Sequence, residues 1–393
     1  MAADTFPDDV ILEILVPDAP ALLRCAATCR RWRALVAHPS FLRRRWPDPE
    51  YSLLGPFRPK ELNEGSALAD GRRLLSSLVP DAAGLPADSV WPLTSRDGLV
   101  LFRLLNHSPG PLIGVPLAMC SLLAESISCT PKDAVLQLLP TEHSPWMKYV
   151  GHAILTGADC RPSSSSSSFK VLMIVAGETD YELHTFVAGQ QSWNAPTRCR
   201  SRAALGFLMN SDAVVCQGAA HWLFCASSIF HVLRVDGETG RVSSTKLMSP
   251  MSPCVSNHDL TVQGDRSRLA TTADGKLLSL CLYDAGLQLV EIWTQPAAGH
   301  GQVWSRTGVI DLEPILEQPQ RAPYVWLRGR CGKLIIMLPR HHGYLVNLQT
   351  GTTQELDIMS SSGPIGESGV YMEIDWTAFF MARLACTTDN NQP

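Results

Sequence analysis

The sequence lacks a long apolar run and the pattern of a secretory signal. No stretch approaches the roughly 20 apolar residues that a membrane-spanning helix needs. The first residues carry acids rather than a basic stretch ahead of an apolar core. We therefore expect an intracellular protein, in the cytoplasm, the nucleus or both, with no membrane partner. In that reducing environment the twelve cysteines are expected to act mainly as small buried apolar side chains.

Positive charge is also scarce. Charged residues make up 18% of the chain and the formal net charge is -4, whereas nucleic-acid-binding proteins usually present a basic face. We therefore expect no nucleic-acid partner. Hydrophobic residues make up 45%, which is typical of a globular chain. A length of 393 residues exceeds what one hydrophobic core normally holds, so we expect two units or one large repeat domain.

Signatures of catalysis are missing as well. The chain has no Gly-x-Ser-x-Gly elbow, no phosphate-binding glycine loop followed by Lys-Ser/Thr, and no His-Glu-x-x-His. Cys216, His221 and Cys225 come nearest to a metal site. They lie in an apolar, strand-like run whose alternate side chains point to opposite faces, and a fourth ligand is missing. This pattern favours core packing over zinc, and we predict no catalytic residue, no metal and no cofactor.

Residues 6–46 have the sequence pattern of short helices. Pro7 with the acids after it is typical of a helix start, and Pro17 and Pro20 separate a first helix from a second one, which we expect to run without a break to Val36. Its apolar side holds Leu22, Leu23, Ala26, Cys29, Trp32, Leu35 and Val36. About forty residues are too few to bury these stripes alone. We therefore expect a partner, or the following domain, to cover them.

Several positions in this segment carry a more specific pattern. They are Phe6-Pro7-Asp8-Asp9-Val10-Ile11-Leu12-Glu13-Ile14-Leu15, Leu22-Leu23-Arg24-Cys25, Cys29-Arg30-Arg31-Trp32 and Phe41-Leu42. In this order they resemble an F-box, particularly those of grass F-box families. The resemblance covers about a tenth of the chain. It implies docking onto a Skp1-type adaptor and, through it, onto a cullin. The residues implied in adaptor binding, or in the small core of the F-box itself, are Pro7, Ile11, Ile14, Leu15, Leu22, Leu23, Cys25, Cys29 and Trp32. The alternative is an ordinary helical hairpin that packs on the next domain.

The rest of the chain consists of short apolar runs separated by Gly, Asp, Asn and Pro, which predicts many short strands. Gly218, Gly275 and Gly332 each open such a run and lie 57 residues apart. Val235–Gly240 and Val346–Gly351 each end a strand in a turn sequence. A period near 50 residues is in the range of kelch-like β-propellers, with room for about six blades.

These patterns predict an α+β multidomain chain: a short α-helical F-box at 4–46, a linker at 47–90, a mainly antiparallel, all-β propeller-like domain at 91–385, and a polar tail at 386–393. The β region resembles, weakly, the F-box-associated and kelch-like domains of plants. The combined resemblance implies a non-catalytic substrate-recognition subunit of an SCF-type ubiquitin ligase, whose target is an unknown protein. Two alternatives stay open: a propeller-fold enzyme, an oxidase or sugar-active protein, with packing helices at its N-terminus, and an F-box scaffold that works outside a ligase.

Overall fold

The computed structural model divides the chain into two compact units, residues 1–142 with 361–393 and residues 143–360. The structure describes residues 22, 25–26, 28–45, 53–54, 90–97, 99–104, 117–121, 150–157, 159, 169–176, 180–188, 190, 192–199, 206–208, 213–226, 229–247, 267–272, 274–283, 289–295, 304–311, 326–330, 332–337, 343–356, 372–373, 377 and 380. Each unit is described by itself below.

The first unit contains the helices α3 (Arg30–Val36) and α4 (Pro39–Arg45), and residues 22, 25, 26 and 28 before them are also helical. The expectation of an unbroken second helix to Val36 is wrong, because Cys29 is extended, with φ -157° and ψ 163°, and caps the start of α3. Its Sγ accepts a hydrogen bond from the backbone N–H of Trp32 at 3.5 Å. The carbonyl of Ala26, before the break, accepts from Nε of Arg33 at 3.3 Å. Side chains thus satisfy backbone groups that a continuous helix would have paired.

The strands of the first unit form two small antiparallel sheets. One contains β2 (Val90–Arg96), β3 (Leu99–Leu104) and β4 (Leu117–Ser121), with Asp97 at φ 47° in the turn between β2 and β3. The other pairs β1 (Leu53–Leu54) with β22 (Met372–Glu373). β1 lies in the stretch expected to be a linker, and it pairs with a strand about 300 residues later in the chain. Hydrogen bonds therefore join the two segments that flank the β-rich region.

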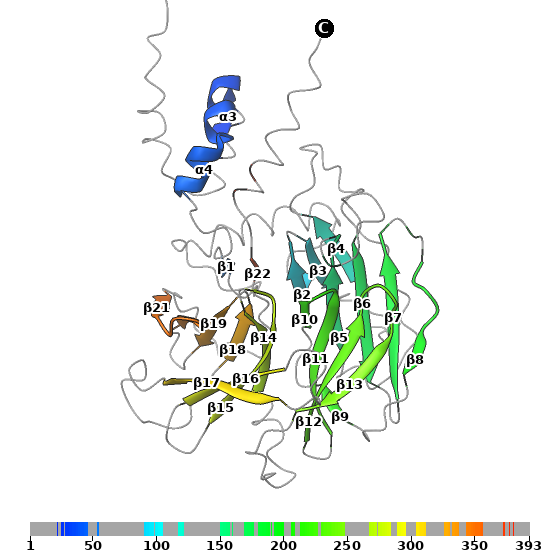
Figure 1. The fold of residues 1–393 in the computed structure, drawn as a ribbon. Helices are drawn as coiled ribbons and strands as arrows, with labels where there is room; N and C mark the ends of the chain where they lie inside the picture. Colours follow the sequence, from blue (N-terminus) through cyan, green and yellow to red (C-terminus); the bar gives the residue numbers. More distant parts are fainter. Residues whose placement is uncertain are drawn as a thin grey trace, which may run out of the picture. The chain divides into compact units, whose positions relative to one another are not determined.

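The second unit consists of four antiparallel sheets that follow one another along the chain (Figure 1). Their strands are β5 (Val150–Leu155), β6 (Lys170–Ala176), β7 (Tyr181–Val187) and β8 (Thr197–Cys199); β9 (Gly206–Leu208), β10 (Val214–Cys216), β11 (Ala219–Ala226), β12 (Ile229–Asp236) and β13 (Val242–Lys246); β14 (Ser267–Thr271), β15 (Leu277–Tyr283), β16 (Leu289–Thr294) and β17 (Ser305–Asp311); and β18 (Trp326–Arg330), β19 (Lys333–Met337), β20 (Gly343–Asn347) and β21 (Thr353–Leu356). In each sheet, four strands pair in chain order, and β9 additionally pairs with β11.

Neighbouring sheets of this unit meet through their first strands and their faces. β10 contacts β5, β14 contacts β10, and β18 contacts β14. Three apolar cores fill the spaces between successive sheets. They contain Ala153, Leu155, Leu172, Ile174, Tyr181, Leu183, Ala220, Trp222, Phe224, Leu233 and Val235; Cys216, Leu223, Val232, Leu247, Leu269, Leu277, Trp293 and Trp304; and Ala270, Leu278, Leu280, Val290, Ile292, Ile310, Leu334, Ile336 and Val346. Four-stranded meanders with adjacent first strands and packed faces are the architecture of propeller blades.

The repeated glycines occupy the turns between the first and second strands of three sheets. Gly218, Gly275 and Gly332 all have a positive φ, at 71°, 75° and 77°. Only glycine adopts this backbone conformation without a steric cost, so the 57-residue spacing in the sequence marks a structural repeat. The predicted fold class, helices followed by an antiparallel propeller-like domain, is confirmed. The number of six blades stays a prediction.

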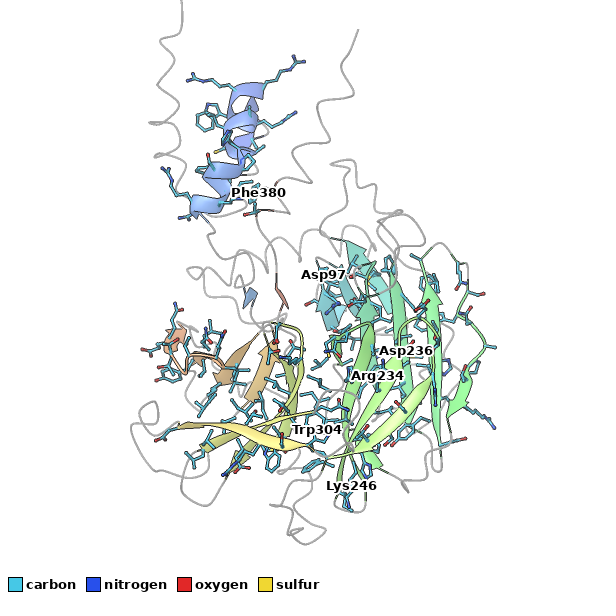
Figure 2. All side chains as sticks on the ribbon, in the orientation of Figure 1. Asp97, Arg234, Asp236, Lys246, Trp304 and Phe380 are labelled. Carbon is cyan, nitrogen blue, oxygen red and sulfur yellow. The ribbon has the colours of Figure 1, made fainter. Side chains whose placement is uncertain are left out.

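The turns after the third strands repeat as well. Oδ1 of Asp236 accepts hydrogen bonds from the backbone N–H and the hydroxyl of Thr239, at 3.0 and 2.8 Å. Oδ1 of Asn347 accepts from the backbone N–H groups of Gln349 and Thr350, at 2.9 and 3.1 Å. In both sheets the next backbone N–H, that of Gly237 or Leu348, donates at 2.8 Å to the carbonyl of the glycine in the first turn. Arg234, which Figure 2 labels beside Asp236, adds an ion pair to that carboxylate at 3.1 Å.

A glycine-to-alanine substitution tests how closely adjacent sheets pack. A Cβ at Gly151 in β5 would lie 2.5 Å from Nε1 of Trp222 in β11 and 2.9 Å from Cγ2 of Ile174 in β6. Both of these side chains are buried in the same core. We expect Gly151→Ala to lower the free energy of unfolding by about 1–3 kcal/mol through overpacking. Gly308→Ala in β17 is the control, because its Cβ would only touch Ile292 at 3.5 Å. Thermal unfolding of both variants measures the difference, and equal melting temperatures would contradict the packing.

Candidate functional site

Four of the nine residues predicted to bind an adaptor fall within the described part of the chain. They are Leu22, Cys25, Cys29 and Trp32. The other predicted residues lie outside the described residues; they are Pro7, Ile11, Ile14, Leu15 and Leu23. The four described residues come from two helical segments, one on each side of the break at Cys29. Their burial separates them into two groups.

Leu22 belongs to the interior. Its side chain is 0% exposed, and Ala26, Val36, Phe41 and Leu42 are also buried. Val36 belongs to α3, Phe41 and Leu42 belong to α4, and these two helices contact each other. Fully burying a leucine side chain contributes about 1.5–3 kcal/mol. Leu22 therefore stabilises the helical segment itself and is not available at its surface.

The remaining three residues are accessible to different degrees. Trp32 and Cys25 are half-buried, as is Leu35, and Cys29 is exposed. Cys29 also has a local role, because its sulfur caps α3. A tryptophan that is only partly covered leaves apolar area in contact with water. Trp32 is therefore the described side chain best suited to pack against a partner protein.

Arginines occupy the outer side of the same helices. Arg30, Arg43, Arg44 and Arg45 are exposed, and Arg31 and Arg33 are half-buried. Nε of Arg33 donates to the carbonyl of Ala26, so part of its guanidinium is already used within the segment. The helical segment thus combines buried apolar residues, a partly covered tryptophan and exposed arginines.

The predicted packing role of Cys216 and His221 agrees with their geometry. Nδ1 of His221 lies 3.7 Å from Sγ of Cys216 and 3.3 Å from the carbonyl oxygen of Val214. Both side chains are buried, and the described residues contain no cluster of three or more metal-ligating side chains. Burial lowers the pKa of His221 to about 4, so its imidazole is neutral at pH 7. The side chain of Cys225 lies outside the described residues.

A buried carboxylate in the third sheet was not predicted. Glu291 in β16 is 8% exposed and accepts hydrogen bonds from Nε1 of Trp293 at 3.1 Å and from Nη1 of Arg306 at 2.9 Å. Its cross-strand neighbour is Cys281. Burial, with a smaller contribution from Glu291, raises the pKa of that thiol, which keeps it protonated and unreactive. The sequence indicates this buried carboxylate only by placing a glutamate inside the apolar run Leu289–Trp293. It does not show that Trp293 and Arg306 donate hydrogen bonds to it.

The match to a known family falls on the helical segment. Residues 4–46 match the family of F-box-like domains. The N-terminal segment is an F-box-like domain. Its partly covered Trp32 and its exposed arginines are the candidate docking site. Among the described residues, no helix is long and apolar enough to cross a membrane.

The chain aligns loosely with two solved structures. The Myceliophteria thermophila Cps50 (Swd1) β-propeller domain has a TM-score of 0.33 and 11% identity, over 72% of this chain and 88% of that one. Bacteroides ovatus GH43B from a xyloglucan PUL has a TM-score of 0.31 and 12% identity, over 72% of this chain and 55% of that one. The propeller-like assignment rests on the sheet topology and the three cores instead. No curated protein is similar enough to this chain to count as a relative.

The lowered pKa of His221 predicts a pH-dependent stability. The unfolded chain binds a proton at this side chain below a pKa of about 6.5, whereas the folded chain does so only below about 4. The neutral imidazole therefore contributes stability that is fully present above pH 6.5 and is lost as the pH falls toward 4, by about 3 kcal/mol. We expect His221→Gln to flatten the fall of the melting temperature between pH 7 and pH 4. A titration of His221 by NMR with a midpoint near pH 6.5 would contradict this.

Proposed function

We propose that this chain is the substrate-recognition subunit of an SCF-type ubiquitin ligase. In this proposal the F-box-like domain binds a Skp1-type adaptor, the adaptor connects it to a cullin, and the propeller-like domain holds a protein target. The observation that supports it best is the F-box-like match over residues 4–46, within which Trp32 remains partly uncovered. A helical segment this small gains stability when a partner covers its apolar residues.

The chain itself performs no chemistry in this proposal. Its contribution is proximity, because holding a target beside the ligase raises the effective concentration of the target's lysines near the conjugating enzyme. The burial of the Cys216–His221 pair supports this view, since a substrate has no access to either group. We further propose a location in the cytoplasm, the nucleus or both, where adaptor and cullin operate, and a kelch-like, plant-type origin for the β region.

Substitution of Trp32 tests the docking site. We expect Trp32→Ala to weaken binding of a Skp1-type adaptor by tenfold or more, since a buried tryptophan at an interface typically contributes about 2 kcal/mol or more. Isothermal titration with the full chain measures the affinity. Trp193→Ala is the matched control, because Trp193 is also half-buried and packs against Phe186 in the second unit, with ring centroids 5.7 Å apart. A wild-type chain that does not bind the adaptor, or equal losses in the two variants, would disprove the proposal.

Substitutions of Leu22 and Leu35 distinguish residues that stabilise the helical segment from residues at its surface. Leu22 is fully buried and Leu35 is half-buried. We expect Leu22→Ala to destabilise the helical segment by about 2–5 kcal/mol, and Leu35→Ala to cost clearly less. Hydrogen exchange of the amides in α3 and α4 reports the stability of this segment directly. Equal exchange rates in the two variants would contradict the division between interior and surface.

A further inference from the structure

The third sheet of the second unit contains a bulge between its last two strands. β16 and β17 pair regularly as far as Ile292 opposite Gly308, and the register then shifts so that Trp293 lies opposite Arg306. Thr307 is the extra residue, and its hydroxyl donates to the carbonyl of Ile292 at 3.4 Å. Because side chains alternate along a strand, a regular ladder would turn Arg306 to the opposite face from Trp293. The bulge places both on one face, and bulges that redirect a side chain are frequent beside functional sites.

Glu291 binds this arginine. It lies two residues before Trp293 and so shares its face, and its carboxylate accepts from Nη1 of Arg306 at 2.9 Å and from Nε1 of Trp293 at 3.1 Å. The arginine side chain is 56% exposed, whereas Glu291 is buried. Within the described part of the chain, no other residue binds the guanidinium. A guanidinium has five N–H donors, so Arg306 is held through one nitrogen and keeps donors for a partner.

The stability of the fold does not explain this pair. The same face belongs to the second apolar core, which contains Leu269, Leu277 and Trp293, and burying a carboxylate there costs desolvation that an apolar residue would avoid. A charge and a bulge at a sheet edge also discourage pairing with other chains. A fully solvated arginine would serve that purpose, however, without a buried acid to orient it. Holding an arginine at the surface in one orientation is instead typical of a binding residue.

Val309 adds an apolar contact to the same face. It lies directly opposite Glu291 in the ladder and is 45% exposed, more than any other large apolar side chain that the structure describes. Arg306 and Val309 stand two ladder positions apart, because Trp293 and Glu291, which lie opposite them, are two residues apart. An exposed valine would not protect an edge from other chains. β17 thus presents a cation and an apolar side chain together.

We propose that the edge of β17 binds an extended segment of the protein target, with an acidic side chain paired with Arg306 and an apolar side chain on Val309. This inference rests on the proposed function and assigns residues of the second unit to the target. β17 is the last strand of its sheet and, at seven residues, the longest of the four fourth strands. Its free edge can therefore pair with an added strand. In such a pairing, the two contacts require an acidic and an apolar residue separated by one residue.

The charge of the site favours a carboxylate. Guanidinium and carboxylate groups bind each other in a bidentate manner. Glu291 already balances the charge of Arg306, so a partner with one negative charge is favoured over a phosphate group, which carries nearly two. The acidic side chain of an unmodified peptide is therefore the expected ligand.

Peptide selection with the purified full chain tests the site. From a phage-displayed library of random peptides, the wild-type chain is expected to enrich sequences in which an acidic residue and Val, Ile or Leu are separated by one residue. A synthetic peptide of this kind is expected to bind Arg306→Gln about tenfold or more weakly than wild type, measured by fluorescence anisotropy. Arg234→Gln is the matched control, because Arg234 also forms an ion pair in the second unit, with Asp236 at 3.1 Å. Its affinity is expected to stay within about twofold of wild type.

Two further variants separate recognition from stability. Val309→Thr keeps a β-branched side chain, so the melting temperature is expected to stay close to wild type while peptide affinity falls about threefold. Glu291→Gln keeps an acceptor for Trp293 and removes the charge that holds Arg306. The NMR signal of the Arg306 Nε–H is expected to be distinct in wild type and to move toward that of mobile arginines in this variant. An unchanged signal would show that Glu291 does not orient the arginine, and would overturn that step.

Each outcome decides the proposal. Enrichment without the acidic and apolar spacing, no enrichment, or equal affinities of wild type and Arg306→Gln would overturn it. Tighter binding of a peptide in which phosphoserine replaces the acidic residue would assign the site to phosphopeptides and overturn it as well. Both arginine variants are expected to bind a Skp1-type adaptor as wild type does. A wild-type chain that selects these peptides but binds no adaptor would disprove the ligase function while the peptide site stands.

Discussion

The fold of the second unit depends on the alternation of side chains along strands that are covered on both faces. In β11, Trp222 and Phe224 face the core shared with the preceding sheet, while Leu223 between them faces the core shared with the next sheet. β15 and β16 divide their side chains between the second and third cores in the same way. A shift of register by one residue would exchange the two sets. Each sheet therefore buries its apolar faces against the sheets beside it.

The sequence predicted those features that depend on local chemistry. Glycine adopts a positive φ without steric cost, and the equal spacing of Gly218, Gly275 and Gly332 in the sequence marked three of the turns that the structure shows. The break at Cys29 was missed, because the residues on both sides of it continue one apolar stripe. Leu22 and Trp32 share that stripe, and only the packing of the helices decides that one is buried and the other partly exposed. The pairing of β1 with β22 could not be predicted from the sequence either, since two-residue strands carry no periodic pattern.

The two units expose different chemistry to their surroundings. The second unit pairs polar groups internally through backbone ladders, through the side chains of Asp236 and Asn347 in turns, and through the buried Glu291 with its two donors. The F-box-like helices leave a tryptophan partly uncovered and four arginines exposed.

The pairing of β1 with β22 imposes an order on events during synthesis. The ribosome completes the helices early, whereas the strand that pairs with Leu53–Leu54 is about 300 residues later in the chain. At about 5–20 residues per second, the interval is roughly 15–60 s. During that time β1 has no strand beside it. Translation thus separates the synthesis of the helices from the moment at which the two flanking segments are joined.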